Sequence, residues 1–346
     1  MFAPQYTITN KILTSISKIE ASVEVIKHSP LLPLWEKQFK DDAIVRAVYH
    51  GTHIEGNRLH KDEAKEVLEG RDVVARPRDI QEIINYRKVI DLIDEEAKRG
   101  IEKINEPLVK KLHRNIVEKI LSENEAGEYR TKQVVVRNST TGEVTFRPPP
   151  PLEVPFLMRE FLYWINKENA DIHPLIKAGI VHHELVRIHP FIDGNGRVAR
   201  VLATLVLFLD GYDIRRFFSL EEYYDRDAAT YYVNLQKASA GDMTAWLEYF
   251  TYGAGVEFDR IKEKILRLSK DVKLKNKIGG QQIYLTERQM KIIEYIQEIG
   301  YLQNQSFSTI FVDVSEDTVL RDIQDLIKKG LIKKIGSTKA ARYVMV

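Results

Sequence analysis

The sequence predicts a mainly α-helical chain that carries one β-hairpin and ends in a separate small domain. Three observations lead to this fold class. Apolar residues recur at helical spacing along most of the chain, and residues 133 to 146 read as two short extended runs around a turn. A lysine-rich segment then separates residues 281–346 from the rest.

Composition limits the kinds of chemistry that this chain can use. It has 346 residues, 52 lysines and arginines against 50 aspartates and glutamates, and no cysteine. Disulfides, thiolate nucleophiles, Fe–S clusters and cysteine-based zinc sites are therefore excluded. The most apolar stretch, 201–209, is far short of the ~20 residues that span a bilayer, and no signal-peptide pattern opens the sequence. We expect a cytoplasmic protein without a membrane partner.

Residues 1–100 are predicted to be a helical region. Gly56 and Asn57 interrupt it before its last helix. Three sets of apolar residues share helix faces: Ile12, Leu13, Ile16 and Ile19; Ile44, Ala47 and Val48; and Ile80, Ile83, Ile84, Val89, Ile90 and Ile93.

Residues 101–255 are predicted to form a helical core with one interruption. Gln133–Val136 and Val144–Phe146 are extended in character and flank turn residues at 138–142, which is typical of a β-hairpin. Four prolines at 148–151 end the hairpin. Helices are expected at 154–167 and 175–188, and again from Val198 to Leu209.

Residues 256–280 are predicted to be a helical linker, and 281–346 a domain that resembles a winged helix-turn-helix. Thr286 and Gln289 form a capping box that opens one helix. Ser315 caps a second helix, which Gly330 ends. Two short extended runs around Gly336 and Ser337 follow and would form the wing.

The densest group of chemical side chains is the segment 189–200, HPFIDGNGRVAR. Gly194, Asn195 and Gly196 can turn their backbone N–H groups inward at a helix N-terminus, which favours an anion. Two arginines three residues apart, Arg197 and Arg200, lie on one face of the helix that follows. Together these features predict a polyphosphate site. No P-loop is present, and no GxGxxG follows a strand, so the site belongs to neither of those classes.

Two further side chains give this segment a catalytic character. Asp193 offers the hard oxygen that suits Mg²⁺. His189 offers a base that titrates near neutral pH.

This segment resembles the Fic family, whose core motif is HPFx(D/E)GNGRxxR. Every defined position is met: His189, Pro190, Phe191, Asp193, Gly194, Asn195, Gly196, Arg197 and Arg200. The run GEYRTKQVVV from Gly127 and the later PPPPLEVPFLM are similar to the family's flap and the segment after it. The resemblance covers about residues 40–250 and implies a Fic-type helical core.

The resemblance implies a role for each motif residue. His189 would deprotonate an incoming Ser, Thr or Tyr hydroxyl, and Asp193 would hold Mg²⁺. Arg197 would contact the β-phosphate region and Arg200 the γ-phosphate. The remaining residues of the phosphate-binding set are Gly194, Asn195 and Gly196, which would cradle the α- and β-phosphates, with Val198 and Ala199 in the same turn.

Two further sets of residues follow from the same resemblance. Tyr231, Tyr232 and Ser239 stand where relatives line the adenine and ribose pocket. The flap would bind the target as an added strand through Gln133, Val134, Val135, Val136 and Arg137.

An upstream motif, GTHIEGN at 51–57, resembles the family's inhibitory motif (S/T)xxxE(G/N). Glu55 would pair with Arg200 and occupy the place of the γ-phosphate. The sequence departs from the motif at one position, because Gly51 stands where the family has Ser or Thr. The adjacent Thr52 is a candidate substitute for the missing hydroxyl.

These features predict a protein adenylyltransferase that moves AMP from ATP to a hydroxyl of a target protein and of itself, with Glu55 as inhibitor. Two alternatives stay open. The same site could remove AMP, or a nucleotide-sensing Fic-like core could serve a DNA-binding regulator. The terminal domain has 9 basic and 8 acidic residues over 281–346, a weak footprint for DNA. Carboxylates such as Asp322 and Asp325 on its second helix are expected to face DNA phosphates unfavourably. We therefore favour protein contact, including homo-oligomerisation, over DNA binding.

Overall fold

The computed structural model describes residues 2–29, 33–137, 142, 144–167, 171–212, 217–239, 241–277, 285–311, 314–336 and 341–346. The chain divides into two compact units, Met1–Lys264 and Ile265–Val346. The predicted hairpin turn at 138–141 and Ser337 of the predicted wing lie outside the described residues. Over the described residues the fold is mainly helical, which confirms the predicted fold class.

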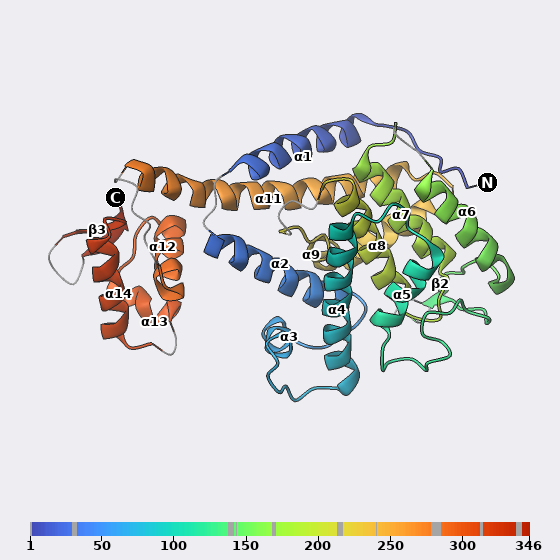
Figure 1. Cartoon of the computed structure of the whole chain (residues 1–346), viewed down its shortest axis with the longest axis horizontal. Helices are drawn as coiled ribbons and strands as arrows, with labels where there is room; N and C mark the ends of the chain where they lie inside the picture. The colour runs from blue at the N-terminus through green and yellow to red at the C-terminus, as the bar shows by residue number, and fades with distance from the viewer. Residues whose placement is uncertain are drawn as a thin grey trace. The chain divides into compact units, whose positions relative to one another are not determined.

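The larger unit is built around two antiparallel helices, α7 (Pro174–Ile188) and α8 (Asn195–Leu209), which pack closely along their length (Figure 1). Both helices are apolar on nearly every side, because other helices cover them all round. The other described helices that lie wholly or partly in this unit are α1 (Asn10–His28), α2 (Pro33–His53), α3 (Lys61–Leu68), α4 (Pro77–Arg99), α5 (Glu106–Ile116), α6 (Val154–Asn166), α9 (Glu221–Arg226), α10 (Ala228–Ala238) and α11 (Thr244–Lys277).

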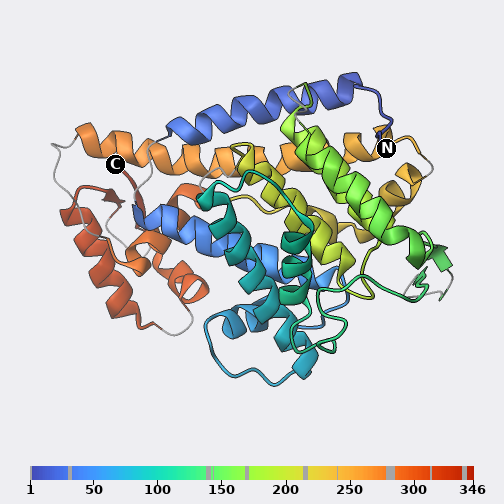
Figure 2. The ribbon, with the colours of Figure 1, turned by 45° about the vertical axis from the view of Figure 1, so that its right-hand side comes forward.

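Helix α1 lies alongside α11 in both ribbon views (Figures 1 and 2). Hydrogen bonds from Thr9 and Ser22 to Glu248 and Asp259 connect the two helices. Helix α11 runs without a break past residue 255, where the sequence predicts a linker to begin. The division into regions at 100, 255 and 280 stays a prediction.

The hairpin is shorter than predicted on its first strand. Strand β1 covers only Val136–Arg137 and pairs with β2, Val144–Phe146, in antiparallel register. The predicted start at Gln133 is wrong, and the prolines explain why. Proline has no backbone N–H, so Pro148 and Pro149 cannot extend the ladder beyond β2. The Gln133 side chain instead donates to the Pro148 carbonyl at 3.0 Å.

The described residues of the smaller unit include the end of α11, followed by α12 (Glu287–Ile299), α13 (Phe307–Ile310), α14 (Glu316–Lys328) and a wing of β3 (Ile332–Ile335) and β4 (Arg342–Met345). The predicted capping box at Thr286 and Gln289 is present. Ser315 precedes α14 in an extended conformation, and its hydroxyl contacts that of Thr318. Gly330 adopts φ of 68°, the left-handed conformation that ends helices, as predicted.

Asp322, which the sequence analysis weighed against DNA phosphates, does not face outward from α14. Its carboxylate is buried and accepts a hydrogen bond from Arg288 at 2.7 Å. Asp325 accepts from Gln289, also at 2.7 Å. Both carboxylates therefore connect α14 to α12, because an amphipathic helix turns some of its polar rim toward its neighbour.

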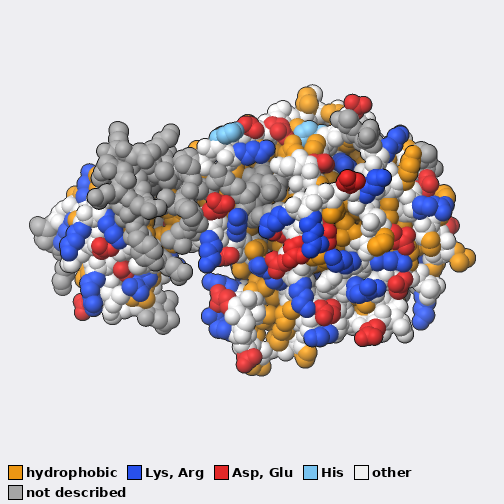
Figure 3. All heavy atoms as spheres, in the orientation of Figure 1, with side chains coloured by type: hydrophobic (Ala, Val, Ile, Leu, Met, Phe, Trp, Pro, Cys, Tyr) orange, Lys and Arg blue, Asp and Glu red, His pale blue; other side chains and the backbone are white. Residues whose placement is uncertain are grey.

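On the face of the larger unit that Figure 3 shows, lysine and arginine side chains are interspersed with aspartate and glutamate. This agrees with the nearly balanced charge of the chain. Within the described residues, no helix combines the length and the apolar character needed to cross a membrane.

Candidate active site

The candidate site is the loop between α7 and α8, where the sequence places its densest chemistry. His189 ends α7 with φ of 51°, and Gly194 precedes α8 with φ of 77°. The Asn195 side chain closes the loop by exchanging two hydrogen bonds of 2.9 Å with the backbone of Phe191. Phe191 is fully buried and anchors the loop in the core.

A buried histidine outside the motif holds this loop to the base of the flap. Gly127 N–H donates to His113 Nδ1 at 2.8 Å, so Nε2 carries the proton and donates to the Asp193 carbonyl at 3.0 Å. The imidazole stacks on Phe191 with ring centres 3.8 Å apart. Burial lowers the pKa of His113 to about 4, so the ring is neutral at pH 7. Sequence reasoning missed His113, because a single histidine on an amphipathic helix forms no pattern.

The catalytic candidate, His189, is oriented by its own helix. Its Nδ1 lies 3.2 Å from the Val186 carbonyl, which can only accept, so Nδ1 carries the proton. Nε2 is thereby the acceptor, the state that a general base requires. Burial lowers the pKa of His189, and the charge of Arg130 acts in the same direction. Arg130 also donates to the His189 carbonyl at 2.8 Å and fixes the start of the loop.

The two motif arginines are buried beside the glycine turn. Arg197 and Arg200 are each 2% exposed, and the Nε atom of each has no hydrogen-bond partner among the described residues. Two buried guanidiniums with unused donors at a helix N-terminus suit a bound anion. Arg197 also lies 3.4 Å from Glu82 of α4 and 3.3 Å from Asp193.

Glu55 already places a carboxylate in this anion site. Its Oε1 accepts from Arg200 Nη1 at 2.9 Å, and Arg200 Nη2 donates to the Gly51 carbonyl at 2.8 Å. The pair that the resemblance implies is therefore present. The same oxygen lies over Gly196, where any Cβ would collide with it. Glycine is thus needed at 196 for a carboxylate, or a phosphate, to approach the helix start.

Tyr86 of α4 occupies the space that a Ser or Thr side chain would need at position 51, where this sequence has glycine. A Cβ atom at Gly51 would lie only 2.7 to 2.9 Å from the Tyr86 ring and hydroxyl. The tyrosine thus fills the space of the missing side chain, and it donates to Glu221 at 3.1 Å. The Thr52 hydroxyl bonds to the carbonyls of Val48 and Tyr49 in its own helix, so it does not take the place of the missing hydroxyl.

A second set of contacts holds the end of α2, next to Glu55. Asp225 of α9 accepts from His50 Nδ1 at 2.7 Å and from His53 Nδ1 at 2.8 Å. Burial raises the pKa of Asp225, but the two histidine hydrogen bonds outweigh it and hold the pKa below its usual range. The Tyr232 hydroxyl donates to the Ile54 carbonyl at 3.2 Å. Nothing in the local sequence pairs α2 with α9, so sequence reasoning missed this clamp.

Asp193 is suited to hold Mg²⁺ with phosphate oxygens. Its side chain is 34% exposed, accepts from Arg78 at 2.8 Å and receives the Gly194 N–H. Burial raises its pKa, but the charge of Arg197, the Gly194 N–H and Arg78 together lower it overall. The group is therefore an ionised, partly open carboxylate. Mg²⁺ bound with a nucleotide often needs only one such ligand from the protein. No group of three or more His, Asp or Glu side chains that could hold a metal by itself occurs within the described ranges.

The remaining predicted site residues occupy different environments. Val198 and Ala199 are fully buried in the core. Tyr231 is 1% exposed, and its hydroxyl contacts His182 Nε2 at 2.9 Å. The Ser239 hydroxyl donates to the Leu235 carbonyl. Of the flap residues, Val136 and Arg137 lie in β1, whereas Gln133, Val134 and Val135 precede it.

Comparisons with known proteins agree with this fold and site. Residues 103–207 match the Fic/DOC family, and residues 288–337 match a DeoR-like helix-turn-helix domain. The protein adenylyltransferases Fic of Drosophila grimshawi and Drosophila melanogaster are 33% and 32% identical over 187 residues, which cover 51% of this chain and 35% of theirs. The chain thus matches about a third of the length of these relatives.

Two solved structures share the fold. A Fic family protein from Desulfovibrio desulfuricans superposes with a TM-score of 0.66 at 23% identity, over 100% of this chain and 98% of that one. A Fic domain-containing signaling protein from Bacteroides thetaiotaomicron gives 0.61 at 25% identity, over 75% and 97%.

The chain thus contains a Fic-type domain and, after it, a helix-turn-helix domain. Residues 103–207 match the Fic/DOC family, which confirms the resemblance seen in the sequence.

Proposed function

We propose that this chain transfers AMP from ATP to a hydroxyl group of a protein. One observation carries the proposal: the unprotonated Nε2 of His189 stands in the loop that leads into the N-terminus of α8, the helix that carries two buried arginines with unused donors. The loop thus combines a base with a polyphosphate-binding surface. The curated relatives are named protein adenylyltransferases, which supports the same reaction here.

The chemistry assigned to each residue follows from its position. Arg197 and Arg200 bind the phosphates beyond the reacting one, and Gly194 to Gly196 present backbone N–H groups to them. His189 Nε2 takes the proton of the Ser, Thr or Tyr hydroxyl as its oxygen forms a bond to the α-phosphorus. The bond from that phosphorus to the bridging oxygen breaks, and pyrophosphate leaves. Mg²⁺, when held by Asp193, neutralises phosphate charge. Most of the rate gain then comes from positioning and electrostatics.

We further propose that Glu55 inhibits this reaction. Its carboxylate bonds Arg200 and lies against Gly196, so it competes with a terminal phosphate for the same donors. The flap around β1 would hold the target as an added strand. Arg130, which precedes β1, connects this segment to the loop by donating to the His189 carbonyl.

Labelling with α-³²P ATP and Mg²⁺ tests the proposal. Glu55→Gly should raise incorporation of label into the protein or a lysate partner about tenfold or more, since a hydrogen bond between charged groups worth ~1.5–3 kcal/mol is lost from the inhibited state. Glu66→Gln, on the surface of α3, is the matched control and should behave as wild type. Labelling of the Glu55→Gly variant at the wild-type level would contradict inhibition. Absence of label in both, under conditions where ATP binds, would contradict the activity.

A further inference from the structure

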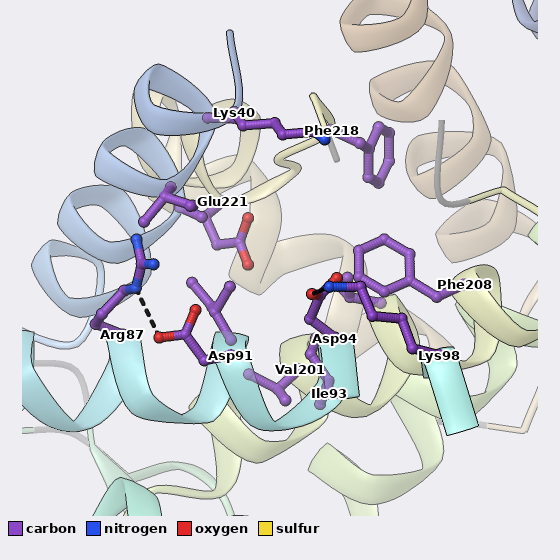
Figure 4. Close-up of a pocket in the computed structure, with 15 residues that line it drawn as sticks. Lys40, Arg87, Asp91, Ile93, Asp94, Lys98, Val201, Phe208, Phe218 and Glu221 are labelled. Carbon is purple, nitrogen blue, oxygen red and sulfur yellow. Dashed lines mark hydrogen bonds and ion pairs between the residues drawn. The ribbon is translucent and has the colours of Figure 1, made fainter. Parts of the chain in front are cut away.

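A cavity of about 390 Å³ lies between α2, α4 and α8, and nothing described above assigns it a role (Figure 4). Its walls are largely apolar and include Ile44, Ala47, Ile90, Val201, Phe208 and Phe218. Cavities of this size and character are typical of sites for small molecules. One of its walls is the helix that ends next to Glu55.

The rim of the cavity is charged but neutralised. Arg87 pairs with Asp91 at 2.9 Å and Lys98 with Asp94 at 2.5 Å, each within α4. Lys40 pairs with Glu36 on α2 at 3.2 Å. The cationic side chains of these pairs are 38 to 67% exposed, so they belong to the surface.

The carboxylate of Glu221 is different, because it is buried and points into the cavity (Figure 4). It accepts hydrogen bonds from the Tyr86 hydroxyl at 3.1 Å and from the Ser219 hydroxyl at 2.9 Å. Both donors are neutral, and over the part of the chain that the structure describes no Lys, Arg or His ion pair to Glu221 occurs. A buried carboxylate without a cation is costly, and each of its oxygens can accept a further hydrogen bond.

We propose that this cavity binds a small organic cation, a primary ammonium on a short apolar chain. The ammonium would donate to Glu221, and the chain would lie on the apolar wall. The rings of Phe208 and Phe218 belong to that apolar wall.

The site is connected to the inhibitory segment through one side chain. Tyr86 bonds Glu221 on one side and packs against Gly51 on the other, and the Gly51 carbonyl holds Arg200. A ligand that contacts Glu221 would therefore act, through Tyr86 and Gly51, on the hydrogen bond between Arg200 and Glu55. This coupling rests on the proposed function, whereas binding itself does not.

Isothermal titration of the full chain with n-hexylammonium tests binding without reference to catalysis. Wild type should bind it, n-hexanol should bind at least tenfold more weakly, and Glu221→Gln should lose affinity for the amine by tenfold or more. Asp91→Asn, which changes a paired carboxylate at the rim, is the matched control and should retain affinity. No saturable binding at millimolar amine, or equal affinity of the Glu221→Gln variant, would overturn the proposal.

A second variant tests whether binding of the amine is lost because the cavity is changed and not because the protein is misfolded. Ala47→Leu leaves Glu221 in place but fills part of the cavity, so it should weaken binding of the amine while circular dichroism stays that of wild type. Unweakened binding would place the amine elsewhere and overturn the proposal. The amine should raise AMP transfer by the wild-type protein, which has Glu55, and should leave transfer by the Glu55→Gly variant unchanged. If binding holds and transfer is absent, the failure lies with the proposed function.

Discussion

At the scale of single residues, the proposed reaction depends on one base, His189, and on the tautomer that its surroundings select. His189 donates from Nδ1 to the Val186 carbonyl, which leaves Nε2 as the only nitrogen that can take a proton. The sequence indicated His189 as the base. Which of its ring nitrogens carries the proton depends on the left-handed backbone conformation at residue 189.

Replacing this base should stop the reaction. We expect His189→Ala, in the Glu55→Gly background, to lower AMP transfer by about 10²–10⁴-fold, the usual contribution of a general base. ATP affinity, measured by titration calorimetry, should change little because the phosphates bind elsewhere in the loop. Transfer that survives in this variant would remove His189 from its role.

The pH dependence of transfer follows from the lowered pKa of His189. Burial places this pKa below 6.5, and the base works only when neutral. Transfer per ATP bound should therefore be constant from pH 8 down to about 6.5, and fall tenfold per pH unit once the pH passes below that pKa. A pH–rate profile of the Glu55→Gly variant measures this. A fall that begins above pH 7 would contradict the assignment.

At the scale of elements, the segment that carries Glu55 is held by several helices at once. Asn57 donates to Glu82 and to the Asp79 carbonyl of α4, Asp225 of α9 holds both histidines at the end of α2, and Tyr232 of α10 bonds Ile54. The proposed inhibition would therefore depend on how α2 packs, because this packing sets the position of Glu55.

Loosening the end of α2 should activate the protein. Asp225→Asn turns an amide N–H toward a histidine N–H, so one hydrogen bond worth ~1–2 kcal/mol is lost. AMP transfer should rise several-fold, less than in Glu55→Gly, and the two changes should not add because they release the same contact. The labelling assay with single and double variants measures this. A full additive effect would show that Asp225 acts independently of Glu55.

At the scale of the whole molecule, a buried cluster around Arg46 connects α2, α9 and α11. Arg46 contacts Glu257 at 2.9 Å and Glu222 at 3.1 Å, and donates to the Phe217 carbonyl. Burial raises the pKa of Glu222, but the hydrogen bond and charge of Arg46 outweigh it and lower the pKa to about 2.

This cluster should make stability depend on pH in the acid range. The pKa of Glu222 is lower in the folded chain than its ordinary value of 4.5. Its contribution is therefore complete above pH 4.5 and is lost as the pH falls toward 2. Glu222→Gln should cost about 1–2 kcal/mol of unfolding free energy at pH 7, and less at pH 3. Urea unfolding followed by circular dichroism at both pH values checks this. An equal cost at pH 7 and pH 3 would contradict it.

The fold could be predicted over long stretches because helical spacing and caps are local signals. The helices near 154–167 and 175–188, the capping box at Thr286 and the helix end at Gly330 all follow from neighbours in sequence. Helix α3 and the true start of β1 were missed. A short helix has little periodicity, and the strand depends on prolines across the hairpin.

The catalytic loop was readable from the sequence because its base, its glycine turn, its carboxylate and its arginines are contiguous, and one helix start brings them together. The environment of Arg200 could be decided only by the tertiary structure. Its partner Glu55 is 145 residues away in the chain, and the Tyr86 ring that replaces a side chain at Gly51 comes from another helix. Such pairings depend on how α2 and α4 pack against α8. A sequence pattern records the period of each helix, whereas the face that each helix presents to the others is settled only when their side chains interlock.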